Sequence, residues 1–272
     1  MATGDSQQAQ QNWRYCGAQI KLWREEAQVT RQALAEEAGY DYEYVKSMEC
    51  GRRRPTLRFL QVADQLCHAR GKLVAAHEFL KPEPFPQRTQ QYVALEAEAI
   101  TVQWYEPLLI PGLLQVEEYA RQLIGSDCPA LDEETVEERV TARLKRQERL
   151  VNKPLAQFTF VMHEAALKAV IGDRAVMRKQ LEHLLEVGGL RNLTLQVLPF
   201  ALAPTVALSG ALILVETAEH DVYAHVEGQE TGALYADGAK ISALAQRYGM
   251  IRSQALGVDE SARFIEKLAE EL

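Results

Sequence analysis

Cysteine is scarce in this 272-residue chain, which contains only four. They lie far apart, at Cys16, Cys50, Cys67 and Cys128. Such spacing fits neither a disulfide framework nor a cysteine-based metal site. We therefore expect a cytoplasmic protein that holds no metal.

Long hydrophobic runs are also lacking. The strongest candidate for a membrane span, residues 192–215, carries no charged residue, but Pro199, Pro204 and Gly210 interrupt it. This punctuation is typical of two strands joined by a loop, whereas a spanning helix needs about 20 consecutive apolar residues. We expect no contact with a membrane.

Positive charge is in short supply, since the formal net charge is −8. Residues 1–81 nevertheless hold two more basic than acidic residues, and the remainder holds ten more acidic than basic ones. A protein that coats nucleic acid without sequence preference would need a stronger basic field. The distribution favours an N-terminal part with modest DNA affinity, for which tight binding requires a homodimer or a second contact with DNA.

Catalytic motifs are missing as well. The pair His163 and Glu164 begins a zinc-protease pattern, but Leu167 stands where the second histidine is needed. If His220 and His225 shared a strand, they would point to opposite faces. The sequence contains no phosphate-binding loop, nucleophile elbow or dinucleotide fingerprint. We expect no catalytic residue and no cofactor, and an enzyme is the least favoured class.

The most informative segment is residues 30–55, which has the pattern of two short helices joined by a tight turn. Gly39 can adopt the positive φ that ends the first helix. Asp41 is a suitable N-cap for a second helix that runs to Glu49, with Val45 and Met48 facing inward. The pattern predicts a helix-turn-helix that reads a double-stranded DNA operator.

The outward face of the second helix supplies the residues expected to read base edges, Tyr42, Glu43, Lys46 and Ser47. Four arginines near this helix are expected to contact phosphates, Arg31, Arg52, Arg53 and Arg54. Pro55 and Thr56 then introduce a further helix that begins at Leu57.

From about Tyr15 to Leu80 the chain resembles the XRE family of repressors. In that family an arginine of the first helix often pairs with a glutamate at the end of the recognition helix, and Arg24 and Glu49 occupy these positions. One departure is Arg31, which stands where the family usually has glutamine. The resemblance implies an all-α DNA-binding domain over residues 15–80.

Residues 1–14 are expected to form a disordered tail, and the proline-rich residues 81–88 a linker. Beyond it, residues 89–272 alternate helical and strand patterns. Helices are expected at 91–99, 116–124, 133–150, 175–186 and 259–272, and strands at 158–162, 193–198, 211–215 and 222–226. The whole chain is therefore predicted to be α+β, with an all-α domain followed by a mixed α/β domain around a small sheet.

Three segments, 104–121, 143–150 and 192–200, resemble the C-terminal domain of WhiJ-like regulators of filamentous bacteria. The resemblance implies a transcriptional regulator, often encoded beside a small partner protein in an antitoxin-like pair. It supplies no chemistry for the C-terminal domain.

The segment 133–150 carries arginines at Arg139, Arg143 and Arg146, none of which has an acidic residue four positions earlier. They either pair with acids elsewhere in the same domain or bind a protein partner. We expect a DNA-binding regulator whose C-terminal domain dimerises and senses a small protein partner or a ligand. The alternative is an antitoxin-like module that sequesters a protein and binds DNA only secondarily.

Overall fold

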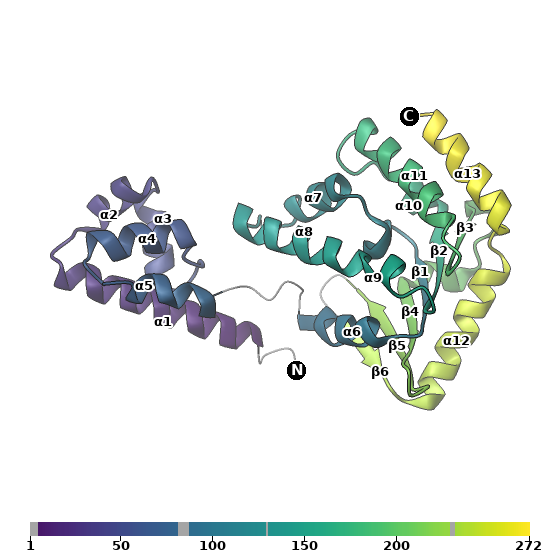
Figure 1. Ribbon diagram of the computed structural model, residues 1–272, viewed down its shortest axis with the longest axis horizontal. Coiled ribbons are helices and arrows are strands. Elements are labelled where there is room, and N and C mark those ends of the chain that lie inside the picture. Colours follow the sequence, from purple (N-terminus) through teal and green to yellow (C-terminus); the bar gives the residue numbers. More distant parts are fainter. Residues whose placement is uncertain (1–4, 81–86, 129, 229–231) are drawn as a thin grey trace. The chain divides into compact units, whose positions relative to one another are not determined.

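The computed structural model describes residues 5–80, 87–128, 130–228 and 232–272. The chain forms two compact units, residues 1–83 and 84–272, which are described separately (Figure 1). Among the described residues, no helix combines the length and apolar character needed to cross a bilayer.

The N-terminal unit is helical. Its elements are α1 (Asp5–Glu26), α2 (Arg31–Ala38), α3 (Tyr42–Glu49), α4 (Leu57–Leu66), α5 (Lys72–Ala75) and the 3₁₀ turn η1 (Ala76–Phe79). Because α1 begins at Asp5, the expected disordered tail over residues 1–14 is wrong from residue 5 onward, and residues 1–4 lie outside the described part. The core is made by apolar residues from four helices, Ile20, Leu34, Ala35, Val45, Met48, Phe59 and Leu60.

Helix starts and a close helix contact explain this arrangement. The hydroxyls of Thr30 and Thr56 cap α2 and α4 by accepting hydrogen bonds from the backbone N–H groups of Ala33 and Phe59. Gly17 lets α1 pass directly over the end of α3, because a Cβ there would collide with the Met48 carbonyl oxygen. Any side chain at this position would push the two helices apart.

The C-terminal unit surrounds one six-stranded sheet. Its helices are α6 (Gln87–Glu98), α7 (Glu117–Gly125), α8 (Glu133–Gln147), α9 (Arg149–Asn152), α10 (Glu164–Lys168), α11 (Arg174–Gly188), α12 (Gly238–Ser253) and α13 (Val258–Glu270). Its strands are β1 (Thr101–Glu106), β2 (Gln157–His163), β3 (Leu193–Leu198), β4 (Ala211–Glu216), β5 (Val222–Glu227) and β6 (Gly232–Tyr235). Short 3₁₀ turns lie at η2 (Gly112–Leu114), η3 (Phe200–Leu202) and η4 (Thr205–Ser209).

The strand order is β3-β2-β1-β4-β5-β6. Strands β1, β2 and β3 are parallel, whereas β4, β5 and β6 continue the sheet in antiparallel fashion. This mixed sheet confirms the expected fold class. The segment 192–215, once a candidate membrane span, forms β3, two 3₁₀ turns and most of β4.

The two faces of the sheet are covered by different helices, because side chains alternate along each strand. Trp104, Phe160 and Ile213 belong to a core shared with residues of α6, α7, α11 and α13. Tyr105 and Leu212 point to the other face, where they join Leu244, Tyr248 and Ile251 of α12. Figure 1 shows α12 apart from the group of α7, α8 and α11.

The connection between α12 and α13 runs along the outer side of β3. The backbone N–H of Val197 donates to Ser261 Oγ at 2.9 Å, and the N–H of Leu256 donates to the Val197 carbonyl at 2.8 Å. These bonds use the strand's outward backbone groups at this position.

Sequence patterns located most of the elements, but not all. The patterns did not predict the strands β1 and β6 or the helices α5, α10 and α12. Helix α6 begins at Gln87, inside the segment expected to be a linker, and residues 81–86 of that segment lie outside the described part. The predicted helix 133–150 is divided at Glu148 into α8 and α9.

Candidate nucleic-acid interface

The α2–turn–α3 segment has the backbone expected of a helix-turn-helix. Gly39 ends α2 with φ 72°, in the left-handed region, and its N–H closes the helix onto Glu36. Asp41 occupies the N-cap position of α3, as predicted, but its side chain makes no capping hydrogen bond. Val45 and Met48 are buried, so the opposite face of α3 points outward.

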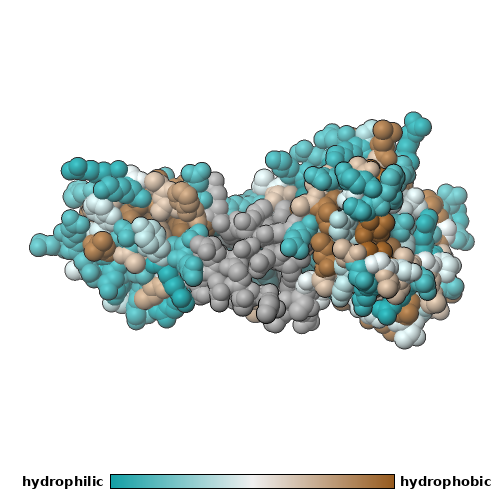
Figure 2. Space-filling view, turned by 90° about the horizontal axis from the view of Figure 1, so that it is seen from below, coloured by the Kyte–Doolittle hydropathy of each residue, from teal (hydrophilic) through white to brown (hydrophobic). Residues whose placement is uncertain are grey.

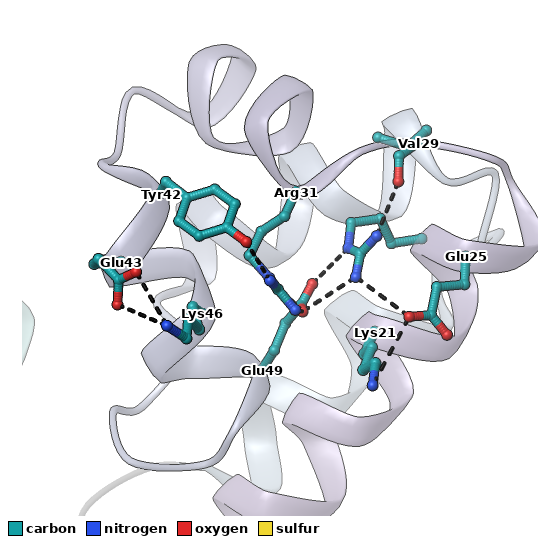
Figure 3. A network of polar contacts seen from close by, with 9 residues as sticks. Lys21, Glu25, Val29, Arg31, Tyr42, Glu43, Lys46 and Glu49 are labelled. Atoms are coloured by element: carbon teal, nitrogen blue, oxygen red, sulfur yellow. Dashed lines mark hydrogen bonds and ion pairs between the residues drawn. The ribbon is translucent and has the colours of Figure 1, made fainter.

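A buried carboxylate fixes α3 to the two preceding helices (Figure 3). Glu49 accepts hydrogen bonds from Arg24 Nε at 2.6 Å and from Arg31 Nε at 2.9 Å. Arg24 also donates to the Val29 carbonyl at 3.0 Å, which ties the α1–α2 connection to the same group. The expected pairing of Arg24 with Glu49 is therefore confirmed, and Arg31 is an additional partner that the sequence pattern did not indicate.

Arg31 lies differently from the phosphate-binding position expected for it. Its guanidinium is engaged by Glu49 and also donates to the hydroxyl of Tyr42 at 2.7 Å. Burial lowers the pKa of Arg31, but the hydrogen bonds to Glu49 and Tyr42 outweigh this effect and raise it above its usual value. In this geometry Arg31 positions Tyr42 at the start of α3, since the hydrogen bonds direct the guanidinium toward protein groups.

The outward face of α3 places three of the expected base-reading residues in view (Figure 3). Tyr42 is 40% exposed. Lys46 Nζ lies 3.1 Å from Glu43 Oε1, and both side chains are exposed. Ser47 is half-buried on the same helix. The outward face of α3 therefore carries the hydroxyls of Tyr42 and Ser47, together with an ion pair in which the charges of Lys46 and Glu43 cancel.

The three arginines that follow α3 are not equivalent. Arg52 and Arg53 are exposed, and the Arg53 guanidinium lies 4.5 Å from the centre of the Tyr44 ring. Arg54 is only 6% exposed, which contradicts its expected role in contacting phosphate. The three consecutive arginines in the sequence did not indicate that Arg54 is buried, because its burial depends on how the chain turns after α3.

The arginines of α8 are not a solvated stripe. Arg146 binds Glu96 of α6, Arg143 donates to Gln115, and Arg139 lies 3.5 Å from Asp127. All three side chains therefore have partners within the C-terminal unit, and two of these partners are acids. Pairing with acids of the same domain, one of the two interpretations of the sequence, holds for Arg139 and Arg146 but not for Arg143.

Comparison with known families agrees with both halves of this description. Residues 16–76 match a helix-turn-helix domain. Residues 89–267, more than half of the chain, match a domain of unknown function, DUF5753. The chain belongs to the DUF5753 family. No curated protein and no solved structure matches it.

The surface of the N-terminal unit is mostly hydrophilic on the face shown in Figure 2, with scattered hydrophobic residues. A polar surface with isolated apolar side chains is ordinary for a unit that meets solvent or nucleic acid. The helix-turn-helix match implies DNA binding by the N-terminal unit, and the chemistry of the C-terminal unit has to be argued from its own residues.

Proposed function

We propose that this protein is a sequence-specific transcriptional regulator of the XRE type that inserts α3 into the major groove of its operator. The observation that carries the proposal is the Glu49 network, which holds α3 rigidly against α1 and α2 while its outer face stays open. A recognition helix must be fixed in this way, because base discrimination depends on where a few side chains sit.

Within this proposal Tyr42, Glu43, Lys46 and Ser47 read base edges. Glu43 would be repelled by phosphate, so it accepts from a cytosine amino group or directs Lys46 toward an acceptor. Arg52 and Arg53 contact phosphates, and their positive charge supplies the part of the affinity that depends on salt.

The C-terminal unit is proposed to dimerise the protein and to sense a small protein partner or a ligand. The N-terminal segment of residues 1–81 has only two excess positive charges, so one copy makes a weak contact with DNA. Two copies on two half-sites would supply the missing affinity.

The test is selection of binding sites from random duplex DNA, with the wild type and three single variants. Lys46→Ala and Glu43→Ala are expected to change the preferred bases at one or two positions. Lys21→Ala, which removes a similarly exposed lysine from α1, is the matched control and should leave the preferred sequence unchanged. Unaltered preference in both α3 variants would rule out this reading face.

The same samples test the remaining parts of the proposal. Removing Arg52 or Arg53 should flatten the log–log dependence of affinity on salt by about 0.9 for each phosphate that the protein no longer neutralises, whereas Arg54→Met should leave the slope unchanged. Light scattering of the full chain should report a dimer, and a monomer at micromolar concentration would contradict the dimer proposal.

A second candidate is an antitoxin-like module that sequesters a protein partner. It is favoured by Glu43, whose side chain is 72% exposed on the proposed reading face. Failure of the selection to enrich any sequence even at low salt, together with binding to the product of a neighbouring gene, would support this candidate over the first.

A further inference from the structure

Two arginines on successive turns of α8 use the same edge of the guanidinium differently. Arg146 donates from Nε to Glu96 Oε1 at 3.0 Å and from Nη2 to Glu96 Oε2 at 2.7 Å. This is the two-pronged arrangement by which arginine binds a carboxylate. Arg143 donates from Nη1 to Gln115 Oε1 at 2.7 Å. Its Nε and Nη2 donate to none of the residues that the structure describes, and Nε is buried.

The unpaired Nε of Arg143 is energetically unfavourable. A buried cation is normally paired with a carboxylate, because desolvation without a partner is strongly unfavourable. Burial and the neighbouring charge of Arg146 lower the pKa of Arg143 to about 10. Within the described ranges no carboxylate lies within ion-pair distance of this guanidinium, although Glu227 attracts it from further away.

The turn η2 passes close to the Nε end of Arg143. Gly112 faces the guanidinium, and a Cβ built there would lie 3.8 Å from Arg143 Nε. The turn is held to α8 by Gln147, whose Nε2 donates to the carbonyls of Gly112 and Gln115 at 2.9 and 2.7 Å. Because position 112 has no side chain, room for a Cβ atom remains between the turn and this part of Arg143.

One acid on the sheet, Glu227, attracts Arg143 from beyond ion-pair distance, and a second, Glu106, lies within electrostatic reach of Glu227. Glu227 pairs in register with Ala211, and Glu106 ends β1, the strand on the other side of β4. Tyr119 lies within electrostatic reach of both Glu106 and Arg143. Burial raises the pKa of Glu106 to about 7, and Glu227 adds to this effect against the hydrogen bond from Trp104. A protonated Glu106 does not repel an anion and can donate a hydrogen bond to one.

We propose that the Nε–Nη2 edge of Arg143 anchors a binding site for a small organic oxyanion, a carboxylate or a phosphate monoester. The planar edge matches either group with two parallel hydrogen bonds. Glu106, Tyr119 and Gln115 form the polar surroundings of the bound anion. This site belongs to the C-terminal unit and is independent of the proposed DNA binding, which needs only the N-terminal unit.

The test uses the full chain in chloride buffer at constant ionic strength. Calorimetric titration with acetate and succinate probes the carboxylate arm, and titration with inorganic phosphate and glycerol phosphate probes the phosphate arm. At least one arm is expected to bind with a Kd below about 1 mM, and the arm that binds identifies the class of anion. Arg143→Met should weaken that binding at least ten-fold. Lys145→Met, which removes an exposed cation two residues away on α8, should leave it unchanged.

A second measurement separates a binding role from a structural one. Without oxyanion, Arg143→Met should unfold at a higher temperature than the wild type, because it removes an uncompensated buried charge, and oxyanion should no longer raise its midpoint. Lack of binding by all four probes, equal binding by Arg143→Met, or a lower unfolding midpoint for this variant would each overturn the proposal. Operator binding measured on the same samples is a result independent of oxyanion binding, since Arg143 lies outside the helix-turn-helix.

Discussion

The two units differ in how the charges of their buried or half-buried ionisable groups are compensated. In the N-terminal unit the carboxylate of Glu49 is bound by two arginines, so the negative charge is more than compensated. In the C-terminal unit Arg143 is half-buried beside a glutamine, and Glu106 holds a carboxyl group that burial makes hard to ionise. The Glu49 network needs no added ligand to compensate its charges, which suits a rigid DNA-recognition unit. The surroundings of Arg143 leave donors unused, which suits a site that is completed by a ligand.

The largest effect on stability is expected from removing the carboxylate of Glu49, which both arginines bind. Glu49→Ala would leave Arg24, which is only 6% exposed, without its carboxylate partner. Loss of one member of a buried ion pair costs about 3–5 kcal/mol. We expect the helix-turn-helix to unfold at much lower urea concentration, measured by hydrogen exchange of the α3 amides. Glu43→Gln, which changes an exposed acid on the same helix, should stay within about 0.5 kcal/mol of the wild type.

A somewhat smaller effect on the free energy of unfolding is expected from the carboxyl group of Glu106 in the C-terminal unit. The pKa of Glu106 is raised to about 7 in the folded chain from an ordinary value of 4.5. Between these two pH values the native state holds the proton more often than the unfolded state, so the free energy of unfolding falls as pH rises through this window. The total contribution is about 3 kcal/mol. Urea unfolding of Glu106→Gln between pH 4.5 and 8 should lack this decline.

The control for that experiment is Glu182→Gln, an exposed acid of α11. It should retain the decline seen in the wild type. If Glu106→Gln shows the same pH profile as both the wild type and this control, the burial of Glu106 does not affect stability.

The smallest effect tests whether Arg31 positions Tyr42. Arg31→Gln, which introduces the residue usual in XRE repressors, removes a hydrogen bond to Glu49 and another to Tyr42. We expect a loss of about 1–2 kcal/mol in unfolding free energy, together with relaxed base preference where Tyr42 reads. The salt dependence of DNA binding should stay almost constant. A flatter salt slope in Arg31→Gln would instead assign Arg31 to a phosphate.

Local patterns predicted the helix-turn-helix well, because its elements are short-range. A glycine at 39, capping threonines at 30 and 56 and inward residues at 45 and 48 are visible within the sequence itself. The pairing of Arg24 with Glu49 was also predictable, because the resemblance indicated both positions.

Long-range features were beyond the reach of these patterns. Strand β1 was missed because it is buried on both faces at Trp104 and Tyr105 and so lacks alternation. Helix α12 was missed because its apolar residues are spread around the helix, with Met250 exposed while Leu244 and Ile251 are buried, and because Gly249 lies within it. The burial of Arg54 and the contact of Arg143 with Gln115 follow from tertiary packing, which sequence spacing alone does not show.

The hydrogen bonds that Val197 makes to the α12–α13 connection have a consequence for solubility. An exposed sheet edge is a template on which strands of other molecules can pair, and proteins that cover such an edge resist aggregation. At β3 a second chain would first have to displace Ser261 and Leu256. Destabilising the start of α13, for example by Ser261→Pro, should therefore increase the tendency of the protein to form β-rich aggregates even if the rest of the sheet stays folded.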